Sequence, residues 1–426
     1  MPLTKPQLNT HLGIEIDNSH TSLSPGDAVT GRVTREQQRP STFTQENLTV
    51  HISLQGRSKV LATENEGDVV RAWRGRLPLL NNKSTQIVLR GPTLTPQAGH
   101  KNKVILQWPF SITIPEHVDR TGFPPDGGWG VEDAFIPPAQ QPETIAEILP
   151  ASFTSHSVNG NVAIEAFVEY YLTAHLPMQE GVKTARLAKL PIRIQHISPR
   201  GRCTIDEHLR AQTHNVSVSS QRLLPEKSNV EPSMADRIRA KLGGKGPEHA
   251  PKLSLSIQVK VPTVLQLDRR DTFPVLIRVT PVWEETDERI RDVPQNIKIN
   301  GMQLYIVSIT ETTAEQGRMD KGEALIELPW QATMGPCEFP LLSTGVGEKF
   351  SYGEVDAGAW LKFRISKQLS GKAWHESLNP TSPDFVTYNI RHSHQLRYQF
   401  ALDVAGQWIT IKGVEDLMIL PPGQAS

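Results

Sequence analysis

The stretch from Val104 to Ile114 constrains the fold more than any other part of the chain. Every second residue in it is large and apolar, and these residues are Val104, Leu106, Trp108, Phe110, Ile112 and Ile114. A period of two is typical of a β-strand with one buried face and one solvated face. Pro109 cannot donate a ladder hydrogen bond, which favours an edge strand or a bulge. We therefore expect a β-sandwich strand with Trp108 and Phe110 in the core.

The same alternation recurs along the chain. The clearest repeats are Leu48–Leu54, Val162–Leu176, Leu253–Val261 and Ile297–Ile309. Helical periodicity is scarce, and Pro25-Gly26 is a typical turn pair between two short strands. The sequence predicts an all-β protein, and its 426 residues suffice for two large sandwiches.

The predicted domains are an N-terminal β-sandwich over 11–198, a polar linker over 199–251 and a C-terminal β-sandwich over 252–420. The two sandwiches have a similar layout, since each begins with a strand, an Asp-bearing turn, a second strand and a long alternating third strand. Within the linker, Met234, Ile238 and Leu242 recur every four residues. This spacing predicts one short amphipathic helix.

Composition narrows the class of protein. Lys plus Arg and Asp plus Glu both total 45, so bulk electrostatics give no attraction to nucleic acid. The only cysteines are Cys203 and Cys337, which is typical of a reducing compartment rather than a disulfide framework. The first residues lack the apolar core of a signal peptide, and no run of about 18 apolar residues occurs. A cytoplasmic protein is expected.

No catalytic motif is present in the sequence. We find no Gly-x-Ser-x-Gly elbow, no phosphate-binding loop and no His-Glu-x-x-His, so no catalytic, cofactor-binding or metal-binding residue is predicted. His392 and His394 lie two apart, which places both on one face of a strand, where a pair of histidines could bind a metal. No Cys or acidic residue is close in sequence, so a solvated pair is favoured.

Two basic stretches supply the candidate contact residues. The predicted linker helix carries Arg237, Arg239, Lys241 and Lys245, which could lie on an anionic membrane leaflet or an acidic cargo tail. The alternative is a linker helix that packs its apolar stripe on one sandwich. Lys183–Arg210 is also net basic and includes Arg200 and Arg202; it coats a solvated strand face or binds an acidic tail.

Four motifs together resemble the arrestin family in its fungal, α-arrestin form. They are Pro25–Val33; Trp108–Pro115; Leu149–Phe153 followed by Val168–Ala174; and Pro383–Ile390 followed by His394–Tyr398. Each is a strand with few distinctive residues, but they follow one another in the order that the family shows. The resemblance implies two immunoglobulin-like β-sandwich domains.

The resemblance also implies a function. It implies a non-enzymatic adaptor or scaffold that binds cytosolic regions of membrane transporters or receptors and links them to ubiquitination, endocytosis and endosomal sorting. Recruitment from the cytoplasm to the plasma membrane or endosomes, as a peripheral membrane protein, would follow. A HECT-type ubiquitin ligase is an implied partner, whose WW domains dock Pro-Pro-x-Tyr segments. Here Pro124-Pro125, Pro137-Pro138 and Pro421-Pro422 lack that tyrosine, so direct docking is not predicted.

Two other functions remain open. An endosomal coat subunit of the retromer type with an arrestin fold would explain the absence of Pro-Pro-x-Tyr. A carbohydrate-binding β-sandwich module would require secretion and exposed aromatics on one sheet. The Pro- and Gly-rich segment 121–142 is expected to be a surface loop, an insertion rather than a docking segment.

Overall fold

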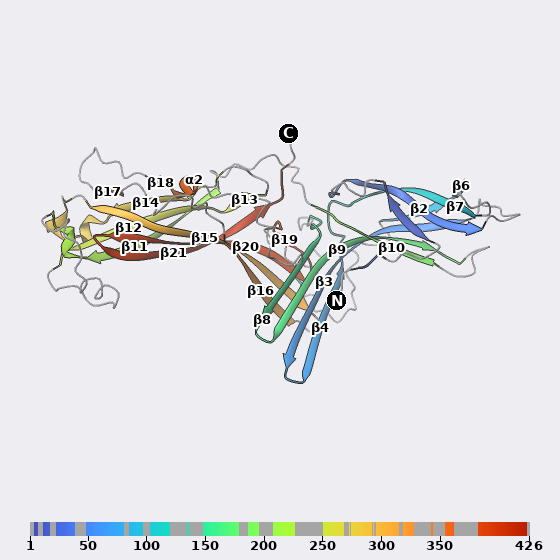
Figure 1. The fold of residues 1–426 in the computed structure, drawn as a ribbon, viewed down its shortest axis with the longest axis horizontal. Coiled ribbons are helices and arrows are strands. Elements are labelled where there is room, and N and C mark those ends of the chain that lie inside the picture. Colours follow the sequence, from blue (N-terminus) through green and yellow to red (C-terminus); the bar gives the residue numbers. More distant parts are fainter. Residues whose placement is uncertain are drawn as a thin grey trace. The chain divides into compact units, whose positions relative to one another are not determined.

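A computed structural model (Figure 1) describes most of the two sandwiches. The described residues are 4–6, 12–17, 23–38, 48–80, 85–96, 103–119, 134–135, 148–178, 186–195, 208–225, 250–267, 272, 274–291, 293, 295–314, 318–327, 342–343, 354–361 and 382–423. About 71% of them are in strands, arranged in mostly antiparallel sheets, so the predicted all-β sandwich fold is confirmed. Among these residues the α-helix is α2 (Ala357–Leu361). The predicted linker helix lies outside them.

The chain divides into two compact units. Unit 1 consists of Met1–Pro199, Ile309–Ala324 and Ser370–Ser393, and unit 2 of Arg200–Ser308, Leu325–Leu369 and His394–Ser426. The division therefore differs from the predicted boundaries, because two segments of the second half pack with the first sandwich.

The first sheet of unit 1 contains the alternating stretch from Val104 to Ile114. Its order is β1 (Gly13–Ile16), β2 (Ala28–Gln38), β7 (Lys103–Thr113) and β6 (Thr93–Pro96). Trp108 and Phe110 are 1% and 6% exposed, which confirms their predicted place in the core. Pairing between β6 and β7 ends at Gln107, so Pro109 faces a strand on one side only, where it pairs with Arg32 of β2. This position tolerates a proline because no β6 carbonyl awaits its missing N–H.

The second sheet of unit 1 is formed around two very long strands. Its order is β10 (Arg186–Ile192), β9 (Val162–Leu176), β3 (Thr49–Glu66) and β4 (Val69–Pro78); β5 (Gln86–Arg90) pairs with β3, and β8 (Phe153–Asn159) pairs with β9. Figure 1 shows β3 with β4 and β8 with β9 as two long adjacent hairpins. The predicted strand Val162–Leu176 is β9 residue for residue.

Segments from the second half of the chain complete the core of unit 1. Ala314, Tyr388 and Ile390 belong to the same buried cluster as Trp108, and Phe385 packs against it. On the inward face of β3, Ser58 donates a buried hydrogen bond to the Asn389 side chain. Long alternating strands bury more apolar surface than one facing sheet covers, and these segments cover part of the rest.

Unit 2 has its own core, which includes Val261, Tyr398 and Ile419. One sheet runs in the order β11 (Leu209–Ser219), β12 (Lys252–Pro262), β14 (Leu276–Pro281) and β18 (Val355–Asp356). The other runs in the order β13 (Val264–Gln266), β21 (Gln407–Leu420), β20 (Ile390–Val404), β15 (Asn296–Ala314) and β16 (Arg318–Glu327); β17 (Leu342–Ser343) pairs with β15, and β19 (Phe385–Val386) pairs with β20.

β11 lies inside the stretch predicted to be a polar linker, and there the structure differs from the prediction. Its inward positions include polar Gln212 and His214 instead of large apolar residues. Both side chains hydrogen-bond to the hydroxyl of Tyr398 at 2.8 and 2.9 Å. Because a polar residue can occupy an inward strand position when it is hydrogen-bonded, the period-two pattern was hidden here. Among the described residues, no helix is long and apolar enough to cross a membrane.

Candidate functional site

A buried ionic cluster lies on the face of β3 and β9 that points away from the core of unit 1. Arg57 is directly opposite Glu169 in the register, and Lys59 lies on the same face two positions along β3. Glu169 Oε1 is 2.6 Å from Arg57 Nε and 2.8 Å from Lys59 Nζ. All three side chains are largely buried, with exposed fractions of 14%, 4% and 7% for Arg57, Lys59 and Glu169.

The N-terminal segment is fixed to this cluster. The backbone N–H of Thr4 donates to Glu169 Oε2 at 2.7 Å, and its hydroxyl donates to Oε1 at 3.0 Å. Arg57 Nη2 donates in turn to the Thr4 hydroxyl at 2.7 Å. Burial raises the pKa of Glu169, but the hydrogen bonds from Lys59, Thr4 and Arg57 outweigh it and hold the pKa below its ordinary value. The carboxylate therefore stays ionised and stabilises the position of Thr4.

Aromatic rings extend the same face. The guanidinium of Arg57 lies 4.9 Å from the centre of the Tyr171 ring, and the ammonium of Lys189 lies 5.9 Å from it. Lys59 lies 5.7 Å from the Phe167 ring. Burial first, and then the like charges of Arg57 and Arg76, lower the pKa of Lys59 more than Glu169 raises it. Because the partially buried cations are paired within the chain, this face is a structural clamp rather than an open site for an anion.

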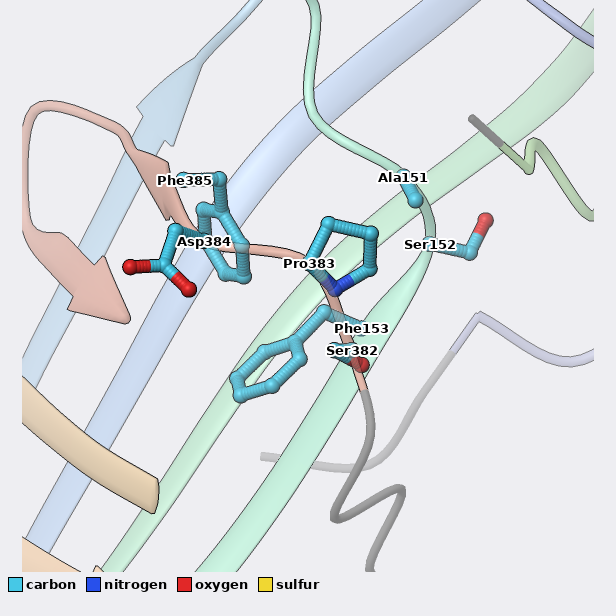
Figure 2. Close-up of a pocket in the computed structure, with 7 residues that line it drawn as sticks. All are labelled: Ala151, Ser152, Phe153, Ser382, Pro383, Asp384 and Phe385. Atoms are coloured by element: carbon cyan, nitrogen blue, oxygen red, sulfur yellow. The ribbon is translucent and has the colours of Figure 1, made fainter. Parts of the chain in front are cut away.

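A small pocket lies where the segment before β19 meets β8. It is lined by Ala151, Ser152, Phe153, Ser382, Pro383, Asp384 and Phe385. The Phe153 and Phe385 rings meet edge to face at 4.9 Å, and the His392 ring lies 4.7 Å from that of Phe153. In Figure 2 the Ser152 hydroxyl and the Asp384 carboxylate point to opposite sides of the pocket. With no pair of polar groups converging on one point, this pocket has the character of a packing seam.

The two long hairpins of unit 1 end side by side. The backbone N–H of Asn65 donates to the carbonyl of Asn161 at 3.0 Å, which joins the β3–β4 turn to the β8–β9 turn. Gly67 and Gly160 adopt positive φ angles of 63° and 61°, as tight turns require. This hydrogen bond holds the two turns in a fixed position relative to each other.

Three valines near these two turns are exposed to solvent. Val69 and Val70 at the start of β4 are 54% and 65% exposed, and Val158 near the end of β8 is 64% exposed. We name these three residues the hairpin end. On β16, Met319 is also 63% exposed, and Gly322 of the same strand contacts Ser157 of β8 so closely that a Cβ there would collide with it. Val70 and Val158 lie on the same face of the sheet, on β4 and β8, with β3 and β9 between them, and Val69 points to the opposite face. Single exposed apolar residues are common, but several beside two joined turns make this end of the sheet a candidate contact surface.

The structure describes none of the six predicted contact residues. Arg237, Arg239, Lys241, Lys245, Arg200 and Arg202 all lie outside the described residues. The predicted solvated pair of histidines is wrong, since His392 and His394 are 3% and 2% exposed. His392 Nδ1 lies 3.1 Å from the Thr310 hydroxyl, so hydrogen bonding offsets its burial. No three His, Cys, Asp or Glu side chains in the described part are arranged to hold a metal ion.

Sequence reasoning missed both the ionic cluster and the hairpin end. Glu169 occupies an outward position of β9, and its pairing with Arg57 of β3 depends on a strand register that one sequence does not reveal. The pair Val69-Val70 directly follows Gly67-Asp68, and two apolar residues in a row beside a turn were the available signal. No family model matches the chain, and no curated protein matches it either.

Proposed function

We propose that this protein is a non-enzymatic adaptor of the arrestin-like kind, which binds the cytosolic regions of membrane transporters or receptors through the hairpin end. The observation that carries the proposal is the exposure of Val69, Val70 and Val158, between 54% and 65%, on strands beside two turns joined by a backbone hydrogen bond. The order of the four sequence motifs supports the same function.

The rigidity of the hairpin end and the burial of its apolar surface would both favour binding of a partner. An exposed valine gains free energy by being buried against a partner, at roughly 25 cal/mol per Å² of apolar surface. Because the two turns are already ordered, little conformational entropy is lost when they dock. β3 and β9 are long strands anchored in the core of unit 1, so the hairpin end is presented on a preformed support.

The experiment is an affinity purification from cross-linked cells that express the full chain. The variant Val69→Ser/Val70→Ser/Val158→Ser removes the apolar surface, and Val88→Ser serves as a matched control, since Val88 is 47% exposed on β5 away from the turns. Wild type and control should recover membrane transporters, receptors or ubiquitin-ligase components. The triple variant should recover them about tenfold less, as for loss of an interface hot spot.

Recovery of abundant soluble enzymes alone would contradict the adaptor proposal. The endosomal coat subunit is the second candidate, and it shares the binding mode but differs in location. Stable residence on endosomes within a coat complex would favour it, whereas transient recruitment to the plasma membrane would favour the adaptor. Proximity labelling of the full chain in living cells reports the compartment and the neighbours in one measurement.

A further inference from the structure

Arg35 occupies a position on β2 where an apolar residue is expected. Val29 and Val33 precede it at alternate positions on the inward face, and both are 0% exposed. Arg35 continues this row and is only 8% exposed. Its neighbour across the ladder on β7 is Leu106, itself 2% exposed. The guanidinium thus lies between the two sheets of unit 1, at the end of the sandwich where β2 ends.

A second arginine approaches from the opposite sheet. Arg186 begins β10 and lies directly opposite Leu176 of β9, which is 0% exposed and faces the core. Directly opposed residues of antiparallel strands point to the same side of the sheet, so Arg186 also points between the sheets. Burial first, and then the like charge of Arg186, lower the pKa of Arg35. Two cations therefore share one end of the sandwich.

The buried donors at this end have no partner in the part of the chain that the structure describes. Arg35 Nε and Nη1 are both fully buried and form no hydrogen bond. Trp108 is the diagonal neighbour of Arg35 on the inward face, because it pairs with Val33, and its indole Nε1 is likewise buried without a partner. Three buried N–H donors thus lie on one sheet face beside two positive charges.

An arginine cannot escape this cost by losing its proton, since its side chain remains charged at any physiological pH. A buried charge without a counter-charge strongly destabilises a fold, and unpaired donors add to that cost. A guanidinium forms paired hydrogen bonds with tetrahedral oxyanions, and a dianion balances two arginines.

We propose that the end of the unit 1 sandwich between Arg35 and Arg186 is a binding site for a small free oxyanion of the phosphate class. Arg35 supplies buried N–H donors from β2, Arg186 supplies the second charge from β10, and the unpartnered indole N–H of Trp108 lies on the same sheet face. This site is independent of the hairpin end and does not rest on the adaptor proposal. The ion acts as a structural cofactor that neutralises the interior.

The test uses the full chain, transferred into phosphate-free buffer of fixed ionic strength and titrated with inorganic phosphate. Thermal unfolding of the wild type should shift upward by about 5–10 °C at a hundredfold excess over Kd. Arg35→Met should unfold at a higher temperature than the wild type without phosphate and should not respond to phosphate. Arg186→Gln should reduce the response. Arg32→Gln, on the outward face of β2 and paired with Glu15, should leave the response unchanged.

A wild-type protein whose unfolding temperature is the same with and without phosphate would overturn the proposal. If Arg35→Met does not fold, the wild-type titration and Arg186→Gln still decide the matter. A response that Arg32→Gln loses as fully as Arg186→Gln would also overturn it, because it would indicate general charge screening. A third arm adds vesicles that contain a phosphorylated inositol lipid. Arg35-dependent vesicle binding without a response to inorganic phosphate would replace the free ion with a lipid headgroup and overturn the assignment.

Discussion

Ser58 on β3 donates a buried hydrogen bond to the side chain of Asn389, 331 positions further along the chain. Both residues are 0% exposed. The bond joins the long β3–β9 pair to a segment of the second half, where Thr387 also hydrogen-bonds to Ile390. The first sandwich is therefore completed by residues from the other end of the sequence.

Replacing Ser58 with alanine should lower the free energy of unfolding by about 1–3 kcal/mol, because the buried Asn389 oxygen then keeps only the long hydrogen bond of 3.5 Å from the Thr387 hydroxyl. Urea unfolding followed by circular dichroism measures the change. Ser155→Ala on β8, where the side chain is half-buried, is the matched control and should cost less than about 0.5 kcal/mol. Equal changes in the free energy of unfolding for the two substitutions would show that the Ser58–Asn389 hydrogen bond does not contribute more to stability than an ordinary half-buried serine does.

The division of the chain predicts the behaviour of its first half alone. A fragment of residues 1–199 lacks Ala314, Tyr388 and Ile390, which are part of the unit 1 core. It should therefore expose apolar surface, bind a hydrophobic dye and unfold at a lower temperature than the full chain. A fragment that matches the full chain in dye binding and in unfolding temperature would contradict this account of the core.

Replacing Glu169 with glutamine should cost about 3 kcal/mol near neutral pH, because it leaves the buried cations Arg57 and Lys59 without their counter-charge. The folded-state pKa of Glu169 lies below its ordinary value of 4.5. Its contribution is thus fully present above about pH 4.5 and is lost as the pH falls through the folded-state pKa. The difference in unfolding temperature between the wild type and Glu169→Gln should therefore become smaller in acid.

The control for that substitution is Glu15→Gln. Glu15 pairs with Arg32 at 2.7 Å, but both side chains are about half exposed. A surface ion pair contributes about 0–1 kcal/mol, so this variant should unfold almost as the wild type does. If the difference in unfolding temperature between the wild type and Glu169→Gln stays constant from neutral pH into acid, the cluster stabilises the fold by packing instead of by charge.

Gly413 of β21 lies directly opposite Tyr398 of β20, and a Cβ there would collide with the tyrosine ring and with Gln212. Gly413→Ala should cost about 1–3 kcal/mol through overpacking. A Cβ at Gly91 has no atom within 4 Å, and the position is strained for alanine only by its positive φ. Gly91→Ala should therefore lower the free energy of unfolding by about 1 kcal/mol. Truncating Tyr398 to leucine should offset part of the Gly413 effect in a double-mutant cycle and none of the Gly91 effect.

The strands that carry strict alternation could be predicted from the sequence. Val162–Leu176 matched its strand end to end, and Trp108 proved buried as expected, because an inward apolar face fixes both the period and the burial of a strand. β11 escaped prediction because hydrogen-bonded polar residues, Gln212 and His214, occupy its inward positions. Local hydropathy does not reveal a hydrogen-bond partner that lies on a strand far away in the sequence.

The contact features could not be predicted for a related reason. Arg35 reads as an ordinary polar interruption in the sequence, and only the register with Leu106 and the burial of its guanidinium distinguish it. The buried state of His392 depends on Thr310 and Phe153, residues 82 and 239 positions away. Such sites depend on pairing between residues far apart in the sequence. A single sequence does not reveal that pairing where the strand lacks an alternating apolar pattern.

The most direct test of the adaptor proposal is site-specific photocrosslinking in cells. A photoreactive residue replaces Val70 or Val158 at the hairpin end, and Val88 on β5 is the exposed control position. Cross-links to the cytosolic regions of membrane transporters or receptors should form from positions 70 and 158 and not from 88. Cross-links to such proteins from all three positions alike, or from none, would contradict the central claim that the hairpin end is the cargo-binding surface.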